Sequence, residues 1–312
     1  MNAAHRAVLA CALVLALVGA GGAVQKNRED NAPAVAAVPP SPVKLLDAGA
    51  GPKLLLRLSP TVGSDNRTTQ HQEQAIRITV NGQTISVAPP ALELDVRTHV
   101  DSVRGHRIRT TSTYDAARVL DAPGTNPDTK AAMSKMVGSL VGQSVTCERT
   151  DAAVLIRCSR FHITFPDEIK ALADTLTKGL ENEQPALAMP FPDEPVGVGA
   201  HWTFSPKATL VGLRSEAQTE VTITAINGRR VEAKLTQTVH FVPGVAKVSG
   251  VDATVESGEL AGGGTVTWNL DSVDALMSAT IEGTSVMTAG TGNASQRIEQ
   301  FQHQSFRVTQ RA

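Results

Sequence analysis

The chain has 312 residues, a formal net charge of −1 at pH 7 and only 3% aromatic residues. Without an excess of basic residues it lacks the electrostatic footprint of a protein that neutralises phosphates, so we expect no nucleic-acid partner. The scarcity of aromatic rings argues in the same way against stacking platforms for single strands. The length suffices for one large domain, or two small ones, with a sizeable core.

Residues 1–23 have the pattern of a secretory signal peptide. Arg6 precedes a short apolar run, and small residues follow it. The run is shorter than the roughly 20 residues that span a bilayer. We therefore predict export to the periplasm or the extracellular space, with cleavage after Ala20 or Ala23. A retained anchor or acylation at Cys11 are the alternatives, and either would tether the protein to a membrane.

Residues 24–50 are rich in alanine and proline and show no apolar periodicity. Such a segment has no apolar face to bury, so we predict a flexible tether. Membrane contact is expected only through the N-terminal segment, if the signal is not cleaved.

Cys147 and Cys158 are the cysteines that remain after removal of the signal. In an oxidising compartment an even pair predicts a disulfide. A hairpin with a four-residue loop, 151–154, would place the two cysteines directly opposite each other. Two buried thiols or a redox pair are the alternatives, although a thioredoxin-type redox pair is spaced Cys-x-x-Cys.

The first half of the domain, residues 51–189, begins with alternating apolar residues that are typical of strands. The pattern around Asn81-Gly82 predicts a hairpin with a loop of even length, in which Val80 faces Ile85. Two longer antiparallel strands are predicted over 92–114.

Two amphipathic helices are predicted later in the same half. The first starts at Asn126-Pro127 and ends at Gly142, and the second follows Pro166. Methionines on the apolar stripe of a helix usually fill a core; the sharper interpretation is a plastic ligand groove. On that interpretation the first helix lines an apolar cavity with Met133, Met136, Val137 and Leu140.

Residues 190–204, PFPDEPVGVGAHWTF, predict an extended crossing followed by the first strand of the second half. Three prolines restrict the backbone to extended conformations. Trp202 and Phe204 share the apolar face of the strand, and we interpret Trp202 as a core anchor rather than a ligand platform. Gly197 and Gly199 fit either a close backbone crossing or a turn.

The second half, residues 205–312, predicts only strands. Around Asn227-Gly228 the apolar residues all have odd numbers, which predicts a three-residue loop, 226–228, with Gly228 left-handed. We interpret Gly262-Gly263-Gly264 as a turn that precedes the strand of Trp268, since no Lys-Ser/Thr follows as in a phosphate loop.

Strands, then helices, then strands again predict the α+β class. We expect a mainly antiparallel, curved, half-barrel-like sheet with two or three covering helices, in one continuous domain. A curved sheet of this kind is able to enclose an apolar cavity.

No catalytic signature is present. The chain contains no Gly-x-Ser-x-Gly elbow, no histidine pair at zinc-ligand spacing and no calcium-loop spacing of acids. We therefore expect no catalytic residues, no metal site and no cofactor.

The helix ending in Leu-x-Gly, the hairpin, the second helix and the junction PFPDEPVGVGAHW together resemble a group of uncharacterised exported bacterial proteins and lipoproteins. These carry a comparable Pro-x-Pro-x-x-Pro-Val-x-x-Gly-x-x-Trp junction and end in a glycine-led hairpin, like residues 264–287 here. The resemblance covers residues 125–290 and implies no assigned activity. More loosely, the layout is similar to that of periplasmic lipoprotein carriers and mycobacterial glycolipid-binding lipoproteins, whose curved sheets hold acyl chains.

We expect a non-enzymatic exported protein of the cell envelope that binds an apolar ligand, such as a lipid or a lipoprotein, between the sheet and the helices. A structural or protein-interaction module of the envelope, with an envelope protein as partner, is the alternative, and an enzyme of unrecognised type is the third hypothesis. The sequence does not predict an oligomeric state.

Overall fold

The computed structural model describes residues 42–121, 127–159, 189–205, 207–210, 213–248, 251–289 and 295–311. The first strands are β1 (Lys44–Asp47), β2 (Ala50–Leu54), β3 (Asp65–Val80), β4 (Gln83–Val87), β5 (Leu92–Arg104), β6 (Arg107–Val119), β7 (Ser144–Thr150) and β8 (Leu155–Cys158). The later strands are β9 (Val196–Val198), β10 (His201–Phe204), β11 (Lys207–Leu210), β12 (Leu213–Asn227), β13 (Arg230–Phe241), β14 (Gly244–Val248), β15 (Val251–Asn269), β16 (Ala275–Ala289) and β17 (Gln296–Gln310). Within these ranges one helix, α2 (Pro127–Gly138), lies between β6 and β7 in the chain.

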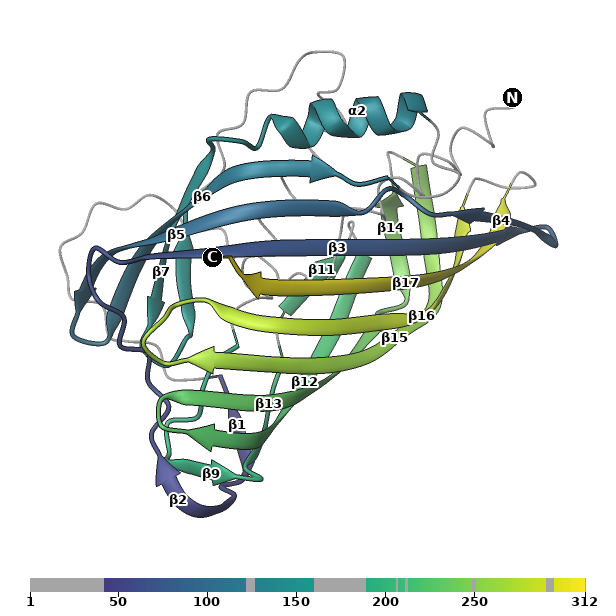
Figure 1. Cartoon of the computed structure of the whole chain (residues 1–312). Helices are drawn as coiled ribbons and strands as arrows, with labels where there is room; N and C mark the ends of the chain where they lie inside the picture. The colour runs from purple at the N-terminus through teal and green to yellow at the C-terminus, as the bar shows by residue number, and fades with distance from the viewer. Residues whose placement is uncertain are drawn as a thin grey trace, which may run out of the picture.

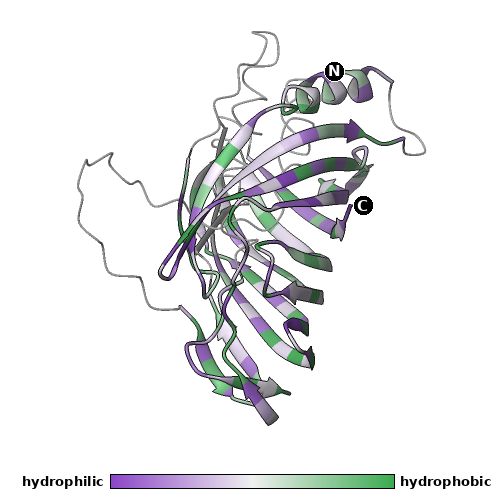
Figure 2. Ribbon diagram, turned by 60° about the vertical axis from the view of Figure 1, so that its left-hand side comes forward, coloured by the Kyte–Doolittle hydropathy of each residue, from purple (hydrophilic) through white to green (hydrophobic). Residues whose placement is uncertain are grey.

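Fifteen strands form a single sheet in the order β1-β10-β12-β13-β15-β16-β17-β3-β5-β6-β7-β8, with β4, β11 and β14 paired alongside β3, β12 and β15. β2 and β9 form a separate pair. Figure 1 shows the long strands following one another down the molecule, with α2 beside β6. In the rotated view of Figure 2 they form one curved layer.

The predicted α+β class is wrong, because the described chain is nearly all antiparallel sheet with one helix instead of two or three. Long strands account for this: β3, β12, β15, β16 and β17 each have 15 residues or more. The predicted curvature is present. The predicted second helix, the signal peptide and residues 24–41 of the predicted tether lie outside the described residues.

The two halves of the chain meet in the middle of the sheet. β17 pairs with β3 along its length, from Ile298 opposite Val80 to Gln310 opposite Thr68. β1, which falls within the predicted tether, pairs with β10 at the edge of the sheet. Residues 190–204 are thus one of several junctions between the halves, and the β3–β17 pairing is the longest of them.

The Asn81-Gly82 hairpin has the predicted even loop, but its register differs. Val80 pairs with Gln83, so the loop has two residues, and Ile78, not Val80, faces Ile85. Both loop residues have positive φ, which suits the tight turns that Asn-Gly favours.

The hairpin at Asn227-Gly228 has a two-residue loop, since Asn227 pairs with Arg230, and the predicted three-residue loop is wrong. Gly228 has the predicted left-handed conformation, with φ of +61°. A β-bulge after Ile223 shifts the register by one residue. The bulge, rather than the loop, therefore lets the odd-numbered apolar residues face one another.

The predicted turn at Gly262-Gly263-Gly264 is wrong, because these residues lie in the middle of β15. A Cβ on Gly262 or Gly264 would come within 2.0 Å of a backbone oxygen of β16, and one on Gly263 within 2.4 Å of the backbone oxygen of Leu235. The glycines thus permit a close approach of neighbouring backbones inside the sheet.

The predicted disulfide is present. Cys147 and Cys158 are paired residues of β7 and β8, and their sulfurs are 2.01 Å apart. The predicted four-residue loop, 151–154, separates the two strands.

One end of the curved sheet is closed by a buried apolar cluster that contains Trp202, Trp268 and Phe191. The side chain of Trp202 is fully buried and its ring stacks on that of Trp268 at 6.5 Å. Gly197, in the predicted crossing, lies so close to β2 that a Cβ there would be 2.2 Å from the backbone oxygen of Ala50. The crossing is therefore a close backbone contact, and the turn follows it at Gly199, where φ is +82°.

A short segment bridges two distant hairpin turns at this closed end. The amide of Leu58 donates to the carbonyl of Asp151 at 2.7 Å, and the amide of Ser59 donates to the carbonyl of Leu270 at 2.6 Å. These bonds join the β7–β8 turn to the β15–β16 turn, which are far apart in the order of the sheet. The segment therefore helps to hold the sheet curved and brings the two turns toward each other.

Candidate functional site

The four predicted cavity residues of the first helix are buried together. Met133, Met136, Val137 and Leu140 pack with residues of β5, β6 and β7, including Leu92, Val96, Tyr114 and Val145. The helix ends at Gly138, earlier than predicted, and a turn with Gly142 at φ of +81° continues to β7. None of the four lines the pocket or the groove described below, and their role in ligand binding stays a prediction.

A partly enclosed pocket of about 80 Å³ lies inside the curved sheet, between this helix cluster and the closed end. One part of its lining is polar: Thr68, Gln70, Thr98, Ser112, Arg149 and Asp274. The other part is mainly apolar: Val96, Tyr114, Leu155, Met189, Val273, Ala275, Met277 and Val308. The pocket is thus amphipathic, and it contains one cation and one anion.

Arg149 reaches the pocket because it continues the inward-facing positions of β7. Its strand neighbours Val145 and Cys147 are buried in the helix cluster, and a residue two positions further along a strand faces the same side. The Nη1 group of Arg149 donates to the carbonyl of Val273 at 3.1 Å. Its Nε group is buried and has no hydrogen-bond partner.

Asp274 comes from the turn between β15 and β16. Its Oδ1 atom accepts a hydrogen bond from the hydroxyl of Thr98 at 3.3 Å, and that hydroxyl lies 3.1 Å from the hydroxyl of Ser112. Its Oδ2 atom is buried without a partner. The two charged side chains therefore face one interior space, each with one polar atom unsatisfied.

Burial governs the protonation of this pair. It raises the pKa of Asp274 to about 6, although the charge of Arg149 and the hydrogen bond from Thr98 act in the opposite direction. Burial also lowers the pKa of Arg149, against the opposing charge of Asp274. A guanidinium nevertheless stays charged in proteins, so near pH 7 the pocket holds a cation beside a mostly ionised carboxylate.

The sequence interpretation did not single out Arg149 or Asp274. The sequence does contain a signal for Arg149. It lies two residues after Cys147 and four after Val145, so it faces the same side of the strand, and a charged residue at such an inward position is unusual. Asp274 lies in a turn, where an acidic residue is ordinary, and only the three-dimensional arrangement places it inside.

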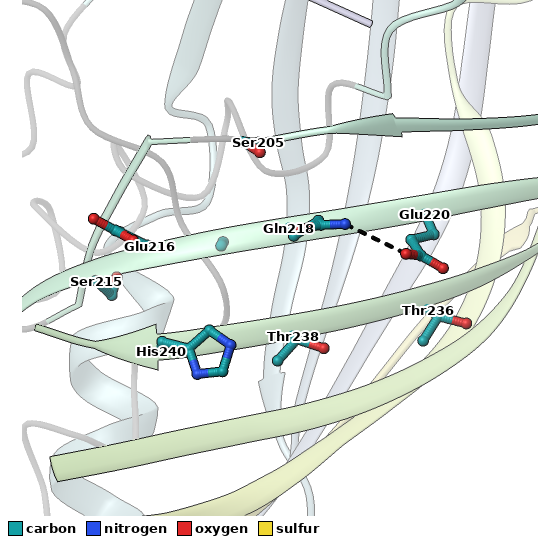
Figure 3. Close-up of a pocket in the computed structure, with 9 residues that line it drawn as sticks. Ser205, Ser215, Glu216, Gln218, Glu220, Thr236, Thr238 and His240 are labelled. Atoms are coloured by element: carbon teal, nitrogen blue, oxygen red, sulfur yellow. Dashed lines mark hydrogen bonds between the residues drawn. The ribbon is translucent and has the colours of Figure 1, made fainter. Parts of the chain in front are cut away.

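A second, more open groove of about 570 Å³ lies along β12 and β13, on the face of the sheet that points away from the core. Figure 3 shows Glu216, Gln218 and Glu220 on β12 and Thr236, Thr238 and His240 on β13. The side chain of Gln218 donates to Glu220 at 3.3 Å. The lining is polar and mostly exposed, as expected of a solvated strand face.

Among the residues that the structure describes, no group of histidine, cysteine and acidic side chains is arranged to hold a metal ion. No helix in the described ranges combines the length and the apolar character needed to cross a bilayer.

No protein-family model matches the chain, and neither does any curated protein. A solved structure titled for lipid–protein interactions in lipovitellin is similar over 81% of this chain, with 10% identity and a TM-score of 0.38, and the chain spans 25% of its length. An outer membrane channel from Pseudomonas putida F1 is 7% identical over 81% of this chain and 98% of its own, with a TM-score of 0.20. The attachment invasion locus protein Ail of Yersinia pestis has 7% identity over 80% of this chain and 100% of its own, with a TM-score of 0.15. TM-scores of this size do not establish a shared fold, so the function proposed below rests on the geometry of the interior.

Proposed function

We propose that this protein is a non-enzymatic, exported protein of the cell envelope that binds an apolar ligand, such as a lipid, inside its curved sheet. The observation that supports this most is the amphipathic pocket, in which apolar side chains from β5, β8, β16 and β17 face unsatisfied polar atoms of Arg149 and Asp274. Polar groups converge on this concave space, as they do in small-molecule sites, but its volume of about 80 Å³ and its largely polar lining suit only the polar end of such a ligand.

The pocket offers few groups for catalysis. Its described lining contains no histidine, lysine or cysteine, and its one candidate base is the carboxylate of Asp274, which already accepts a hydrogen bond from Thr98. The hydroxyl of Thr98 is engaged by Ser112 and Asp274, which supports a positioning role.

Export is supported by the disulfide between Cys147 and Cys158, because such bonds persist in oxidising compartments. The disulfide joins the outermost pair of strands at one edge of the sheet, β7 and β8.

The alternative, a module for protein interaction, predicts an exposed apolar patch or a long free strand edge instead of a cavity. In the described part of the chain β1 and β8, at the two ends of the large sheet, have four residues each, and β4, β11 and β14, which are paired alongside it, have four or five. Short edge strands are one of the ways in which proteins avoid pairing with other chains. The edges therefore favour the binding hypothesis over the interaction hypothesis.

Displacement of a fluorescent long-chain fatty acyl probe tests the proposal. We expect saturable binding to the purified full chain, weakened about tenfold or more by Ser112→Phe, which places a ring in the pocket. Thr238→Phe on the outward face of β13 is the matched control and should bind like the wild type. Absence of saturable binding to the wild type, or equal binding by a folded Ser112→Phe variant, would show that the proposal is wrong.

A further inference from the structure

We propose that Arg149 and Asp274 form the polar end of the ligand site and select an uncharged, hydroxyl-bearing head group on an otherwise apolar ligand. This inference rests on the proposed function and adds the chemical class of the ligand. It follows from which atoms are unsatisfied, from the charges around them and from the size of the space.

The unsatisfied atoms define a complementary donor and acceptor. Arg149 Nε is a donor, Asp274 Oδ2 is an acceptor when ionised, and both are buried without a hydrogen-bond partner. The two charges attract each other, but no hydrogen bond from the described residues satisfies Arg149 Nε or Asp274 Oδ2. Leaving such groups unpaired in the interior is costly, so a bound group that accepts from Arg149 and donates to Asp274 would relieve both costs together. A hydroxyl group does both.

The charges of the pair disfavour an ionic head group. A carboxylate or phosphate would be attracted by Arg149 but repelled by Asp274, and an amine would meet the reverse situation. In a buried site each unfavourable contact is stronger than in water, because the local dielectric constant is lower. An uncharged hydroxyl avoids both repulsions.

The volume restricts the head group to a small one. A space of about 80 Å³ is the volume of two or three water molecules, at roughly 30 Å³ each. The hydroxyls of Thr98 and Ser112 lie beside Asp274 and add further hydrogen-bonding capacity. Val96, Met277 and Val308 form the apolar side of the same space. A primary alcohol or a glycerol-type diol fits this combination of size, polar partners and apolar side.

Three probes with the same chain length and different heads test the inference: monoolein, sodium oleate and oleylamine. Their ability to displace a fluorescent acyl probe from the full chain is measured near pH 7.5. We expect the wild type to prefer monoolein by about tenfold over either charged probe. In Asp274→Asn the charge of Arg149 is no longer balanced, so oleate should gain about tenfold relative to monoolein.

Asp271→Asn is the matched control, because Asp271 belongs to the same turn but is exposed and paired with Arg229. It should leave the order of the three probes unchanged. Equal binding of the three probes by the wild type, or an unchanged order in Asp274→Asn, would overturn the inference on the head group while leaving the proposed function intact; the pocket would then hold water. Failure of all three probes to bind would reject the proposed function as well.

Discussion

Replacement of Asp274 by asparagine should change the pH dependence of stability in a defined way. The carboxyl is buried among Arg149, Thr98 and the apolar pocket lining, and burial raises its pKa from 3.8 to about 6. Asparagine has nearly the same shape and does not ionise. The variant therefore removes the cost of a buried negative charge and leaves the packing almost unchanged.

The magnitude follows from the difference in pKa between the folded and unfolded states. A rise of about two pH units corresponds to roughly 3 kcal/mol, at 1.36 kcal/mol per unit, as an order of magnitude. Because the folded state keeps its proton to higher pH, it binds more protons than the unfolded state between about pH 4 and 6. The contribution of this group to the free energy of unfolding is therefore lost as the pH rises through that window.

Urea unfolding of the wild type and Asp274→Asn at intervals from pH 4 to pH 8 measures this effect. We expect the two proteins to have similar stability near pH 4, and the variant to be more stable by about 1–3 kcal/mol near pH 7. Asp271→Asn, at an exposed position of the same turn, should show no such divergence. A constant difference in stability between Asp274→Asn and the wild type across the whole pH range would refute the claim that burial raises the pKa of Asp274.

Three further changes test the framework around the pocket. Trp202→Ala should lower the free energy of unfolding by about 3–5 kcal/mol, measured by urea denaturation, because the ring is fully buried at the closed end; a loss under 1 kcal/mol would contradict its role as core anchor. Joint replacement of Cys147 and Cys158 by alanine should cost about 2–3 kcal/mol by thermal unfolding, whereas two free thiols in the native protein, detected by alkylation and mass spectrometry, would contradict the disulfide. Gly262→Ala should strongly destabilise the sheet, since the new Cβ would meet a backbone oxygen at 2.0 Å, whereas Gly138→Ala in α2 meets nothing and should stabilise by up to about 1 kcal/mol. Equal effects of the two alanines in a thermal melt would contradict the close backbone approach within β15.

Local pattern predicted much of the sheet but not its continuity. The Cys147–Cys158 hairpin follows from parity and turn length, which are both local properties. The predicted loop length at Asn227-Gly228 is wrong because a β-bulge after Ile223 shifts by one residue which positions of β12 and β13 face each other. The spacing of apolar residues does not reveal such a bulge. The glycines around Gly263 suggested a turn. In the structure they are needed because the backbones of β13 and β16 lie very close to β15, and this closeness exists only in the assembled sheet.

The candidate site was less predictable than the fold. Arg149 is visible in the sequence as a charged residue at an inward position of its strand, next to a predicted disulfide. Its partner, Asp274, lies more than a hundred residues away, in a turn that Leu58 and Ser59 tie to the β7–β8 turn. The pairing of β17 with β3, which joins the two halves, is likewise long-range. Neither relation has a local signal.

Native mass spectrometry of the full chain mixed with monoolein tests the central claim most directly, since it reports whether the curved sheet holds an apolar ligand. We predict a one-to-one complex with the wild type that is strongly reduced in a folded Ser112→Phe variant. Detection of the unliganded chain alone at monoolein concentrations that saturate other lipid-binding proteins would contradict the claim.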